Sequence, residues 1–288
     1  MHLLNPLTKM ESSTRKSSYA SSAHPSHSSH RYDVAGPSFR LLPSYLKSTN
    51  YRNPTELTNG PFQYAHKTSL PFFAWLDQNP PFLSIFNNYM SAYRAGKPTW
   101  CDSGFYPLEE NLVEGFDPNA SDVLLVDVGG GLGHDLQELQ TRYPSLPGKL
   151  ILQDRAEVIS TITSTTLTTQ AQAHDFFTPQ PVKHARAYYL HSVLHDWSDE
   201  DCIRILQNLI PALKKGYSKI LLNEIVVAEE KASLPATAMD QLMLVLGAMR
   251  ERTEKQWRDL LGEAGLKVGR IYTYPGVGES LIEVELAE

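Results

Sequence analysis

Apolar and polar positions along the chain predict, most clearly, a strand that ends in a glycine turn. The run from Val123 to Val128 is almost wholly apolar and predicts a buried strand, and three consecutive glycines follow it. Beyond the glycines, Leu132, Leu136 and Leu139 fall on one face of a predicted helix. Strand, glycine turn and helix in this order place backbone N–H groups and a helix N-terminus against a ligand.

After this turn, predicted strands and helices alternate, which is typical of an α/β fold. Strands are predicted at residues 149–153, 170–177, 185–191 and 218–227, and helices at residues 156–165, 199–213, 239–249 and 254–264. Two final strands, at 267–274 and 280–286, are joined by a Pro-Gly-Val-Gly turn. The pattern predicts a domain over residues 119–288 with a mostly parallel sheet of seven strands and an antiparallel C-terminal end.

The sequence before this domain has a different composition. Residues 1–36 are rich in serine and histidine and poor in apolar residues, so we expect a disordered leader. Its few acidic residues leave a targeting segment as an alternative. Residues 37–118 are richer in aromatic residues, and we expect a helical region there. Within it, one apolar stripe at helical spacing predicts either core packing or the wall of a substrate pocket: Phe82, Ile85, Phe86, Tyr89, Met90 and Tyr93.

Composition narrows the class of function. Of the 288 residues, 41% are hydrophobic and 20% charged, as in ordinary globular proteins. A net charge of −6 without a basic stripe argues against nucleic acid as the main partner. No apolar run approaches the ~20 residues that span a bilayer. Cys101 and Cys202 lie far apart and outside any metal-binding spacing, so we expect free thiols in a reducing compartment, namely the cytoplasm.

Two nucleotide-like cofactors fit the glycine turn. A dinucleotide fingerprint requires G-x-G-x-x-G; Gly129 and Gly131 match its first two glycines, but His134 occupies the third position. Asp127 stands two residues before Gly129, with Gly130 completing the turn. A carboxylate there would repel a pyrophosphate, yet it suits a cofactor that carries an ammonium and a sulfonium, such as S-adenosylmethionine. The turn alone does not decide between the two.

Acidic residues also follow the next two predicted strands. Asp154 ends the second strand and could accept hydrogen bonds from ribose hydroxyls of either cofactor. Asp175 follows the third, where its carboxylate and Phe176 could flank an adenine. Ligands of open α/β sheets bind outside the carboxyl ends of the strands, so Asp127, Asp154 and Asp175 are expected to converge on one site. Any one of them alone is equally explained as a residue that starts a loop.

His195 follows the fourth predicted strand and precedes a helix that Ser198 is expected to cap. This places the histidine at the same edge of the sheet as the three acids. A lone histidine is more often structural than catalytic, so its neighbours matter.

The segment from Leu190 to Cys202, LHSVLHDWSDEDC, resembles the signature of small-molecule O-methyltransferases of the plant caffeate/flavonoid type and their fungal relatives. Residues 126–133 are similar to the cofactor turn of that family, and residues 152–155 to its ribose-binding segment. The resemblance extends from about Leu41 to the C-terminus, and further matches lie at residues 174–177, 219–224 and 250–254 and at Trp257. It implies a Rossmann-like methyltransferase domain and S-adenosyl-L-methionine as cofactor.

The resemblance also implies roles for individual residues. His195 would be the general base that removes a proton from a substrate hydroxyl. Glu224 and Glu251 would flank His195 and hold its ring through hydrogen bonds. The resemblance implies no metal. Cofactor contacts would come from Asp127, Gly129, Gly130, Gly131, Asp154, Asp175, Phe176 and His191, although the family usually has Lys or Arg at the position of His191.

The resemblance leaves the substrate and the oligomeric state open. Residues 37–118 would be a shortened remnant of the family's helical dimerisation region, so we expect at most a weakened homodimer. The acceptor is expected to be an aromatic or polyketide-like small molecule of secondary metabolism, bound near Phe86, Tyr89, Met90, Tyr93, Trp100, Asp196, Met239 and Met243. Two alternatives remain. One is a pericyclase of the same fold that retains the cofactor, and the other is a catalytically silent paralogue that acts as a binding subunit.

Overall fold

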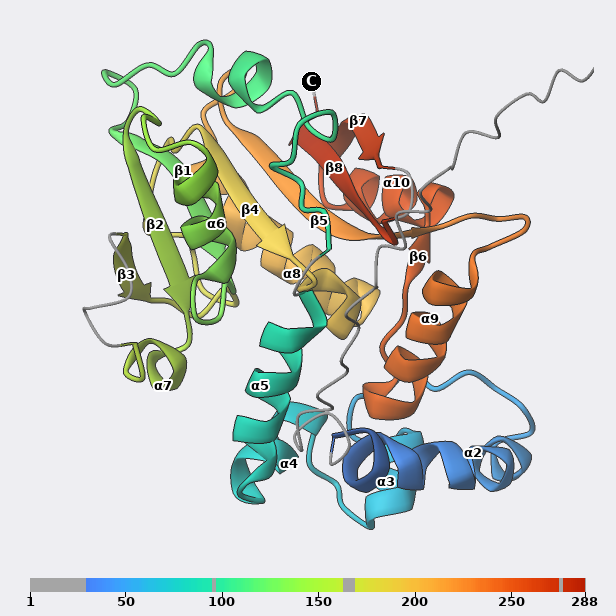
Figure 1. Cartoon of the computed structure of the whole chain (residues 1–288). Coiled ribbons are helices and arrows are strands. Elements are labelled where there is room, and N and C mark those ends of the chain that lie inside the picture. Colours follow the sequence, from blue (N-terminus) through green and yellow to red (C-terminus); the bar gives the residue numbers. More distant parts are fainter. Residues whose placement is uncertain (1–29, 95–96, 163–168, 275–276, 288) are drawn as a thin grey trace, which may run out of the picture.

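The structure, a computed structural model, describes residues 30–94, 97–162, 169–274 and 277–287. One sheet, with helices on both faces, forms the larger part of the molecule (Figure 1). Its strands lie in the order β3-β2-β1-β4-β5-β8-β7, and β6 pairs with β5. The strands are β1 Val123–Val128, β2 Lys149–Asp154, β3 Gln170–Ala173, β4 Ala187–His191, β5 Lys219–Val227, β6 Arg252–Thr253, β7 Leu266–Thr273 and β8 Glu279–Leu286.

Pairing directions confirm the predicted fold class, but the sheet of the described residues has eight strands, one more than predicted, because the short strand β6 was not predicted. Strands β1 to β5 pair in parallel, and β6 adds a short parallel bridge to β5. Strand β8 is antiparallel to both β5 and β7, so the C-terminal end of the sheet is antiparallel as expected. All six residues of β1 are buried, because helices cover both faces of the parallel part.

The helices of this domain are α6 His134–Arg142, α7 Ala156–Ile159, α8 Asp199–Leu209, α9 Leu234–Gly247 and α10 Glu254–Glu263. Apolar side chains of α8 and α10 pack against one face of the sheet, and those of α6 and residues 100–112 against the other. Three of these helices are preceded by a residue whose side-chain hydroxyl accepts a hydrogen bond from the first turn: Ser198 caps α8, Ser233 caps α9 and Thr253 caps α10.

Several predicted boundaries are wrong. The helix expected over 156–165 ends at Ile159, and residues 163–168 lie outside the described residues. The strand expected over 170–177 stops at Ala173, because the next residues form a turn. Helix α9 begins five residues earlier than expected, at Leu234, where Ser233 supplies the cap. The helix expected over 199–213 ends as α8 at Leu209, and a 3₁₀ turn that contains Pro211, Ile210–Ala212, follows it.

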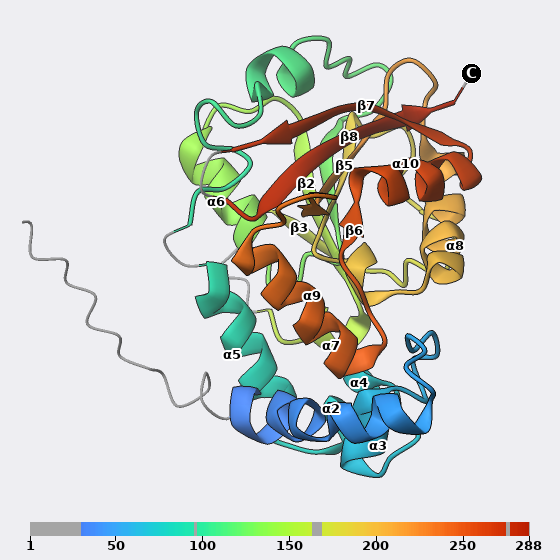
Figure 2. The same ribbon diagram turned by 90° about the vertical axis from the view of Figure 1, so that its right-hand side faces the viewer.

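A second group of helices precedes the sheet: η1 His30–Ala35, α2 Gly36–Ser48, α3 Pro61–His66, α4 Phe72–Gln78, α5 Phe82–Arg94 and, nearer the sheet, η2 Glu109–Val113. Figures 1 and 2 show α2, α3 and α4 against the far end of α9, away from the sheet. Their aromatic side chains share one cluster with apolar residues of α9. Helical structure begins at His30, seven residues before the predicted boundary at 37, and the rest of the predicted leader, residues 1–29, lies outside the described residues.

In the part of the chain that the structure describes, no helix has the length and apolar character required to cross a membrane. Cys101 and Cys202 are both free and buried.

Candidate active site

The glycine turn after β1 is shaped so that only glycine fits its middle position. Gly129 and Gly131 have φ of 76° and 60°, in the left-handed region. A Cβ atom on Gly130 would lie 2.3 Å from Oδ2 of Asp127, whereas one on Gly131 would meet no atom within 4 Å. The backbone N–H groups of Gly129 and Gly130 donate to the carbonyl of Gln153 on β2, at 2.8 and 3.1 Å. The turn is therefore packed tightly onto Asp127 below and is open above Gly131.

Asp154 lies beside this turn, as the sequence predicts. Its Oδ2 accepts a hydrogen bond from the N–H of Gly131 at 2.8 Å, and its Oδ1 from the N–H of Arg155 at 2.7 Å. Burial raises the pKa of Asp154, and the two N–H donors partly offset that rise. The carboxylate is thus held at the open side of the glycine turn.

Phe176 also lies at the turn, and Asp175 lies further out. A Cβ atom on Gly129 would be 3.7 Å from the ring of Phe176, whose edge packs against Trp197 with centroids 5.8 Å apart. Asp175 is exposed, and its Oδ1 accepts from the N–H of Phe177 at 2.9 Å. Phe176 therefore supplies an apolar wall next to the glycines, and Asp175 closes the turn that follows β3.

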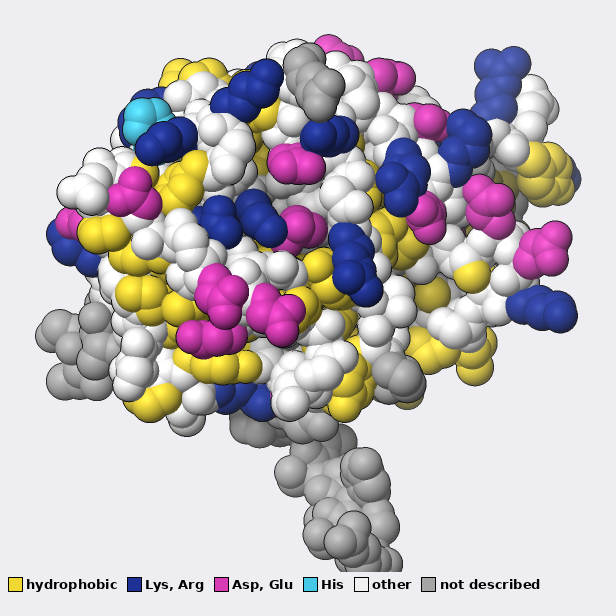
Figure 3. All heavy atoms as spheres, turned by 90° about the horizontal axis from the view of Figure 1, so that it is seen from above, with side chains coloured by type: hydrophobic (Ala, Val, Ile, Leu, Met, Phe, Trp, Pro, Cys, Tyr) yellow, Lys and Arg dark blue, Asp and Glu magenta, His cyan; other side chains and the backbone are white. Residues whose placement is uncertain are grey.

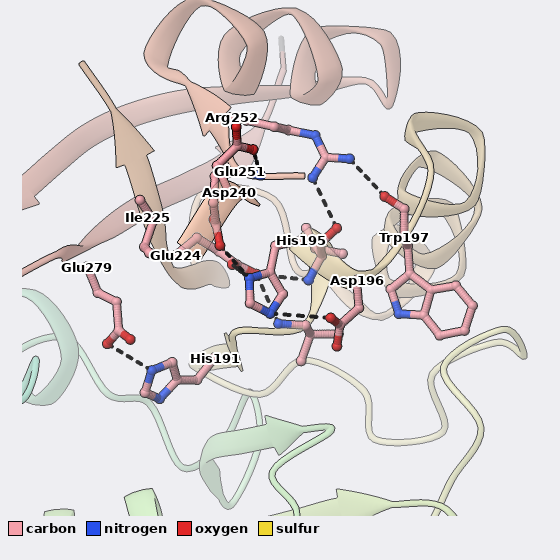
Figure 4. Close-up of polar contacts among 12 residues, drawn as sticks. His191, His195, Asp196, Trp197, Glu224, Ile225, Asp240, Glu251, Arg252 and Glu279 are labelled. Atoms are coloured by element: carbon pink, nitrogen blue, oxygen red, sulfur yellow. Dashed lines mark hydrogen bonds and ion pairs between the residues drawn. The ribbon is translucent and has the colours of Figure 1, made fainter. Parts of the chain in front are cut away.

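His191 is held between two carboxylates at the end of β4. Its Nδ1 lies 2.6 Å from Oδ2 of Asp135 on α6. Its Nε2 lies 3.1 Å from Oε2 of Glu279 on β8, the contact drawn in Figure 4. Neither partner was predictable from the sequence, because they lie 56 and 88 residues away along the chain. The predicted contact of His191 with the cofactor stays a prediction.

His195 is buried and forms a hydrogen bond to a buried carboxylate. It lies in a 3₁₀ turn, Leu194–Asp196, directly after β4, and the residue is 8% exposed. Its Nδ1 is 2.9 Å from Oε1 of Glu251, whose side chain is fully buried (Figure 4). Because Nδ1 is bonded to Glu251, Nε2 is the ring nitrogen that remains for an acceptor, and it faces Oδ1 of Asp196 at 3.5 Å. The loop also contacts the glycine turn, because a Cβ on Gly129 would lie 3.1 Å from Val193.

The hydrogen bond expected between Glu224 and the His195 ring is a wrong prediction. Oε2 of Glu224 is 3.9 Å from Nδ1 of His195, beyond hydrogen-bond distance. Its Oε1 accepts instead from the backbone N–H groups of Val193 and Leu194, at 3.0 and 2.8 Å. Glu224 therefore holds the backbone that leads into His195 and acts on the ring through charge.

Three carboxyl groups surround the imidazole and favour its cationic form. Oδ1 of Asp196 is 3.5 Å from Nε2 of His195, on the side opposite Glu251. Burial lowers the pKa of His195, but the charges of Asp196, Glu224 and Glu251 outweigh burial and raise it to about 10. For the acids burial acts in the opposite direction, and it raises the pKa of Glu224 to about 7 and that of Asp196 to about 6.

His195, Glu224 and Glu251 are also of the residue types that ligate divalent cations, and one donor atom of each lies within 4.8 Å of the others. The ring nitrogen nearest the two acids is already bonded to Glu251, and one oxygen of Glu224 is bonded to backbone N–H groups. These bonds suit an imidazole paired with carboxylates, and the absence of a metal from the reaction stays a prediction.

Three of the predicted substrate residues, Phe86, Met239 and Met243, lie in the cluster between α9 and the preceding helices. Phe86 packs edge-on against Phe72 and Phe73, with ring centroids 5.7 Å apart in both pairs. Met243 is buried in the same cluster, and Met239 packs at its border. Phe82 and Phe86 of the stripe both pack in this cluster, which fits the core-packing interpretation.

The other predicted substrate residues are distributed more widely. Tyr89 is buried and Met90 partly buried on α5, and the side chain of Tyr93 lies outside the described residues. Trp100 is buried and stacks on Tyr189 of β4, with ring centroids 4.9 Å apart. Asp196, in contrast, is brought directly to His195.

Comparison with known proteins shows the family to which the chain belongs. A family model described as an O-methyltransferase domain matches residues 108–267, more than half of the chain. O-methyltransferase mpaG' of Penicillium brevicompactum is 57% identical over 258 residues, which cover 89% of this chain and 65% of that protein. Methyltransferase cfoC of Aspergillus candidus is 41% identical over 88% of this chain and 62% of its own length. The chain thus spans somewhat less than two thirds of these curated relatives.

Solved structures agree on the fold. One described as a pericyclic reaction enzyme has a TM-score of 0.83 and 29% identity, covering 91% of this chain and 67% of that one. OxaC in complex with sinefungin and meleagrin has a TM-score of 0.79 and 28% identity, over 90% of this chain and 65% of its own. With the family model and the 57% identical relative, these matches confirm the resemblance found in the sequence. The chain belongs to the O-methyltransferase family.

Proposed function

We propose that the protein is an S-adenosylmethionine-dependent O-methyltransferase that methylates a hydroxyl of an aromatic or polyketide-type small molecule in fungal secondary metabolism. The observation that carries the proposal is the buried hydrogen bond between His195 and Glu251, on a loop that packs against the glycine turn. The names of the fungal relatives, mpaG' and cfoC among them, support the same reaction class.

The residues around the glycine turn fit the proposed cofactor. Asp154, at the open side of Gly131, is placed to accept hydrogen bonds from ribose hydroxyls. Phe176 offers an apolar face to the adenine, and Asp127 supplies negative charge beneath the turn, which suits a cationic ligand. A related structure, LepI at 29% identity, is described as a complex with S-adenosylmethionine. When bound, this cofactor supplies an electrophilic methyl group.

The imidazole of His195 then acts as general base through Nε2. The acceptor hydroxyl would give its proton to Nε2, and its oxygen would bond the methyl group as the S–CH₃ bond of the cofactor breaks and S-adenosylhomocysteine leaves. Glu251 accepts the Nδ1–H bond and stabilises the imidazolium that results. The charge of Glu224 adds to this effect while its Oε1 holds the loop backbone.

A pericyclase is the second candidate, because a structure described as a pericyclic reaction enzyme has the same fold at 29% identity. The His195–Glu251 pair favours methyl transfer, since a rearrangement without proton transfer gives this base no task. Mass spectrometry of reactions with S-adenosylmethionine and candidate acceptors separates the two. A product heavier by one CH₂ supports the methyltransferase, and an altered product of unchanged mass supports the pericyclase.

A catalytically silent binding subunit is the third candidate. Calorimetry with S-adenosylmethionine separates it from both enzymes, because an absence of binding favours the silent subunit.

The proposed partner is a small-molecule acceptor, with a weak homodimer as the expected oligomeric state. On the described surface seen in Figure 3, basic and acidic side chains are interspersed, which agrees with the net charge of −6 in giving no support for a nucleic acid partner. The free, buried cysteines support the proposed cytoplasmic location.

A further inference from the structure

We propose that Arg252 is a positioning residue for the base: its guanidinium holds the loop that carries His195 against the segment that carries Glu251. The inference deepens the proposed methyl transfer and rests on it. The loop concerned comprises residues 192–199 and is called the base loop below.

Most side-chain hydrogen bonds of Arg252 are with the base loop. Nη1 donates to the carbonyl of Leu194 at 3.0 Å, and Nη2 donates to the carbonyl of Trp197 at 2.9 Å (Figure 4). Nε and Nη2 both donate to Oδ1 of Asp199, at 3.0 and 2.8 Å. The Arg252 side chain is 0% exposed. The two carbonyls bracket His195 and Asp196, so one side chain fixes the backbone on both sides of the base.

The backbone around Arg252 is fixed as well. In β6, Arg252 pairs with Val226 of β5, two residues beyond Glu224. The guanidinium lies over the ring of Trp257 at 5.1 Å, and the indole N–H of Trp257 donates to the carbonyl of Ile225 at 3.3 Å. Strand β5 therefore carries Glu224 and also anchors the segment that presents Glu251.

Further bonds join this segment to the base loop. The N–H of Arg250 donates to the carbonyl of His195 at 3.2 Å, and its guanidinium pairs with Asp199. Glu251 contributes the bond to the imidazole, while its own N–H donates to Oδ1 of Asp240 at 3.0 Å. Three consecutive residues thus bind one loop, and the central one bears the acid that the base requires.

The geometry requires a guanidinium. Its planar fork donates in several directions at once, while the single ammonium of lysine cannot reach both carbonyls and the carboxylate from one point. Loss of the fork leaves the charge in place but lets the imidazole move relative to Glu251 and the acceptor. A misplacement of ~1 Å at a reacting group can cost on the order of 100-fold in rate.

Arg252→Lys tests the proposal, with Arg258→Lys as the matched control. Arg258 is 48% exposed and pairs with Glu254 within α10. We expect R252K to bind S-adenosylmethionine with a Kd within about twofold of wild type by calorimetry, while kcat falls about 10- to 100-fold and the acceptor KM changes little. R258K should match wild type in all three. A kcat of R252K within about twofold of wild type overturns the proposal, as does an equal loss of cofactor affinity and kcat.

A second readout does not depend on turnover. The imidazole of His195 is titrated by NMR in ¹⁵N-histidine-labelled protein, with His195→Gln identifying its signals. Loosening the base loop weakens the bond to Glu251, so the titration of His195 in R252K should move to lower pH than in wild type and R258K. An unchanged titration contradicts the positioning role. If wild type transfers no methyl group to any acceptor, the proposed function fails, while this titration still decides the role of Arg252. Arg252→Met serves as the stronger perturbation, and if it does not fold, R252K decides.

Discussion

Replacement of Glu251 by glutamine removes the carboxylate that bonds His195 and preserves its shape. Both partners are buried and their atoms are 2.9 Å apart, so the bond has the strength of a charged one, about 1.5–3 kcal/mol. One pH unit of pKa corresponds to about 1.4 kcal/mol, so E251Q should lower the pKa of His195 from about 10 by roughly one to two pH units. The loss of imidazolium stabilisation should lower the plateau of kcat about 10- to 100-fold.

The direction of the pH dependence follows from the role of a base. His195 accepts a proton only when Nε2 is deprotonated, and the surrounding carboxylates raise its pKa, so kcat of wild type should increase with pH above neutrality. In E251Q the rise of kcat with pH should occur at lower pH, and the value that kcat reaches at high pH should fall. The assay is kcat at saturating cofactor and acceptor between pH 6 and 10, beside the NMR titration of His195.

Glu224→Gln is the matched control for this prediction. Glutamine retains a carbonyl oxygen that can accept from the N–H groups of Val193 and Leu194 and removes a charge 3.9 Å from the ring. Since no hydrogen bond to the ring is lost, E224Q should shift the rising limb less than E251Q does. Equal shifts in the two variants, or an E251Q profile identical to that of wild type, would show that the hydrogen bond to Glu251 does not raise the pKa of His195.

Three further predictions concern the base, the cofactor and metals. His195→Ala should leave the affinity for S-adenosylmethionine nearly unchanged in calorimetry while kcat falls on the order of 10²–10⁴-fold, and an equal loss of both would make His195 structural. Asp154→Ala should weaken cofactor binding by about 1–3 kcal/mol, because the carboxylate beside Gly131 is lost, and an unchanged Kd would show that the ribose assignment is wrong. Dialysis against EDTA should leave kcat unchanged, because His195 and Glu251 are already bonded to each other; restoration of a lost activity by added divalent metal would contradict the metal-free reaction.

The sequence predicts best those features that depend on short stretches of chain. Strand β1, the glycine turn and α6 follow from consecutive residues, and the apolar run leaves few alternatives to a strand buried on both faces. The antiparallel final pair was likewise predictable from two strand patterns around a turn. Asp154 and Phe176 lie at the glycine turn for the same reason, because parallel strands bring their carboxyl ends together.

Features that depend on contacts between distant segments were not predictable. Glu224 bonds the backbone of the base loop and not the His195 ring because of where that loop lies beside β5. The apolar pattern of β5 alone does not predict the position of the loop. The partners of His191 come from α6 and β8. The role of Arg252 was missed because the carbonyls it contacts carry no sequence signal, although the neighbouring Glu251 was identified.

Methyl transfer with His195 as the general base can be followed with S-adenosylmethionine that carries a CD₃ group. Wild type and His195→Ala are incubated with the labelled cofactor and phenolic and polyketide-type acceptors, and the products are analysed by mass spectrometry. We expect a product with an intact CD₃ group on oxygen for wild type, and a rate at least about 100-fold lower for His195→Ala at unchanged cofactor binding. Transfer by His195→Ala at the wild-type rate would show that His195 is not the base, and cofactor binding by wild type with no labelled product from any hydroxyl acceptor would show that the protein is not an O-methyltransferase.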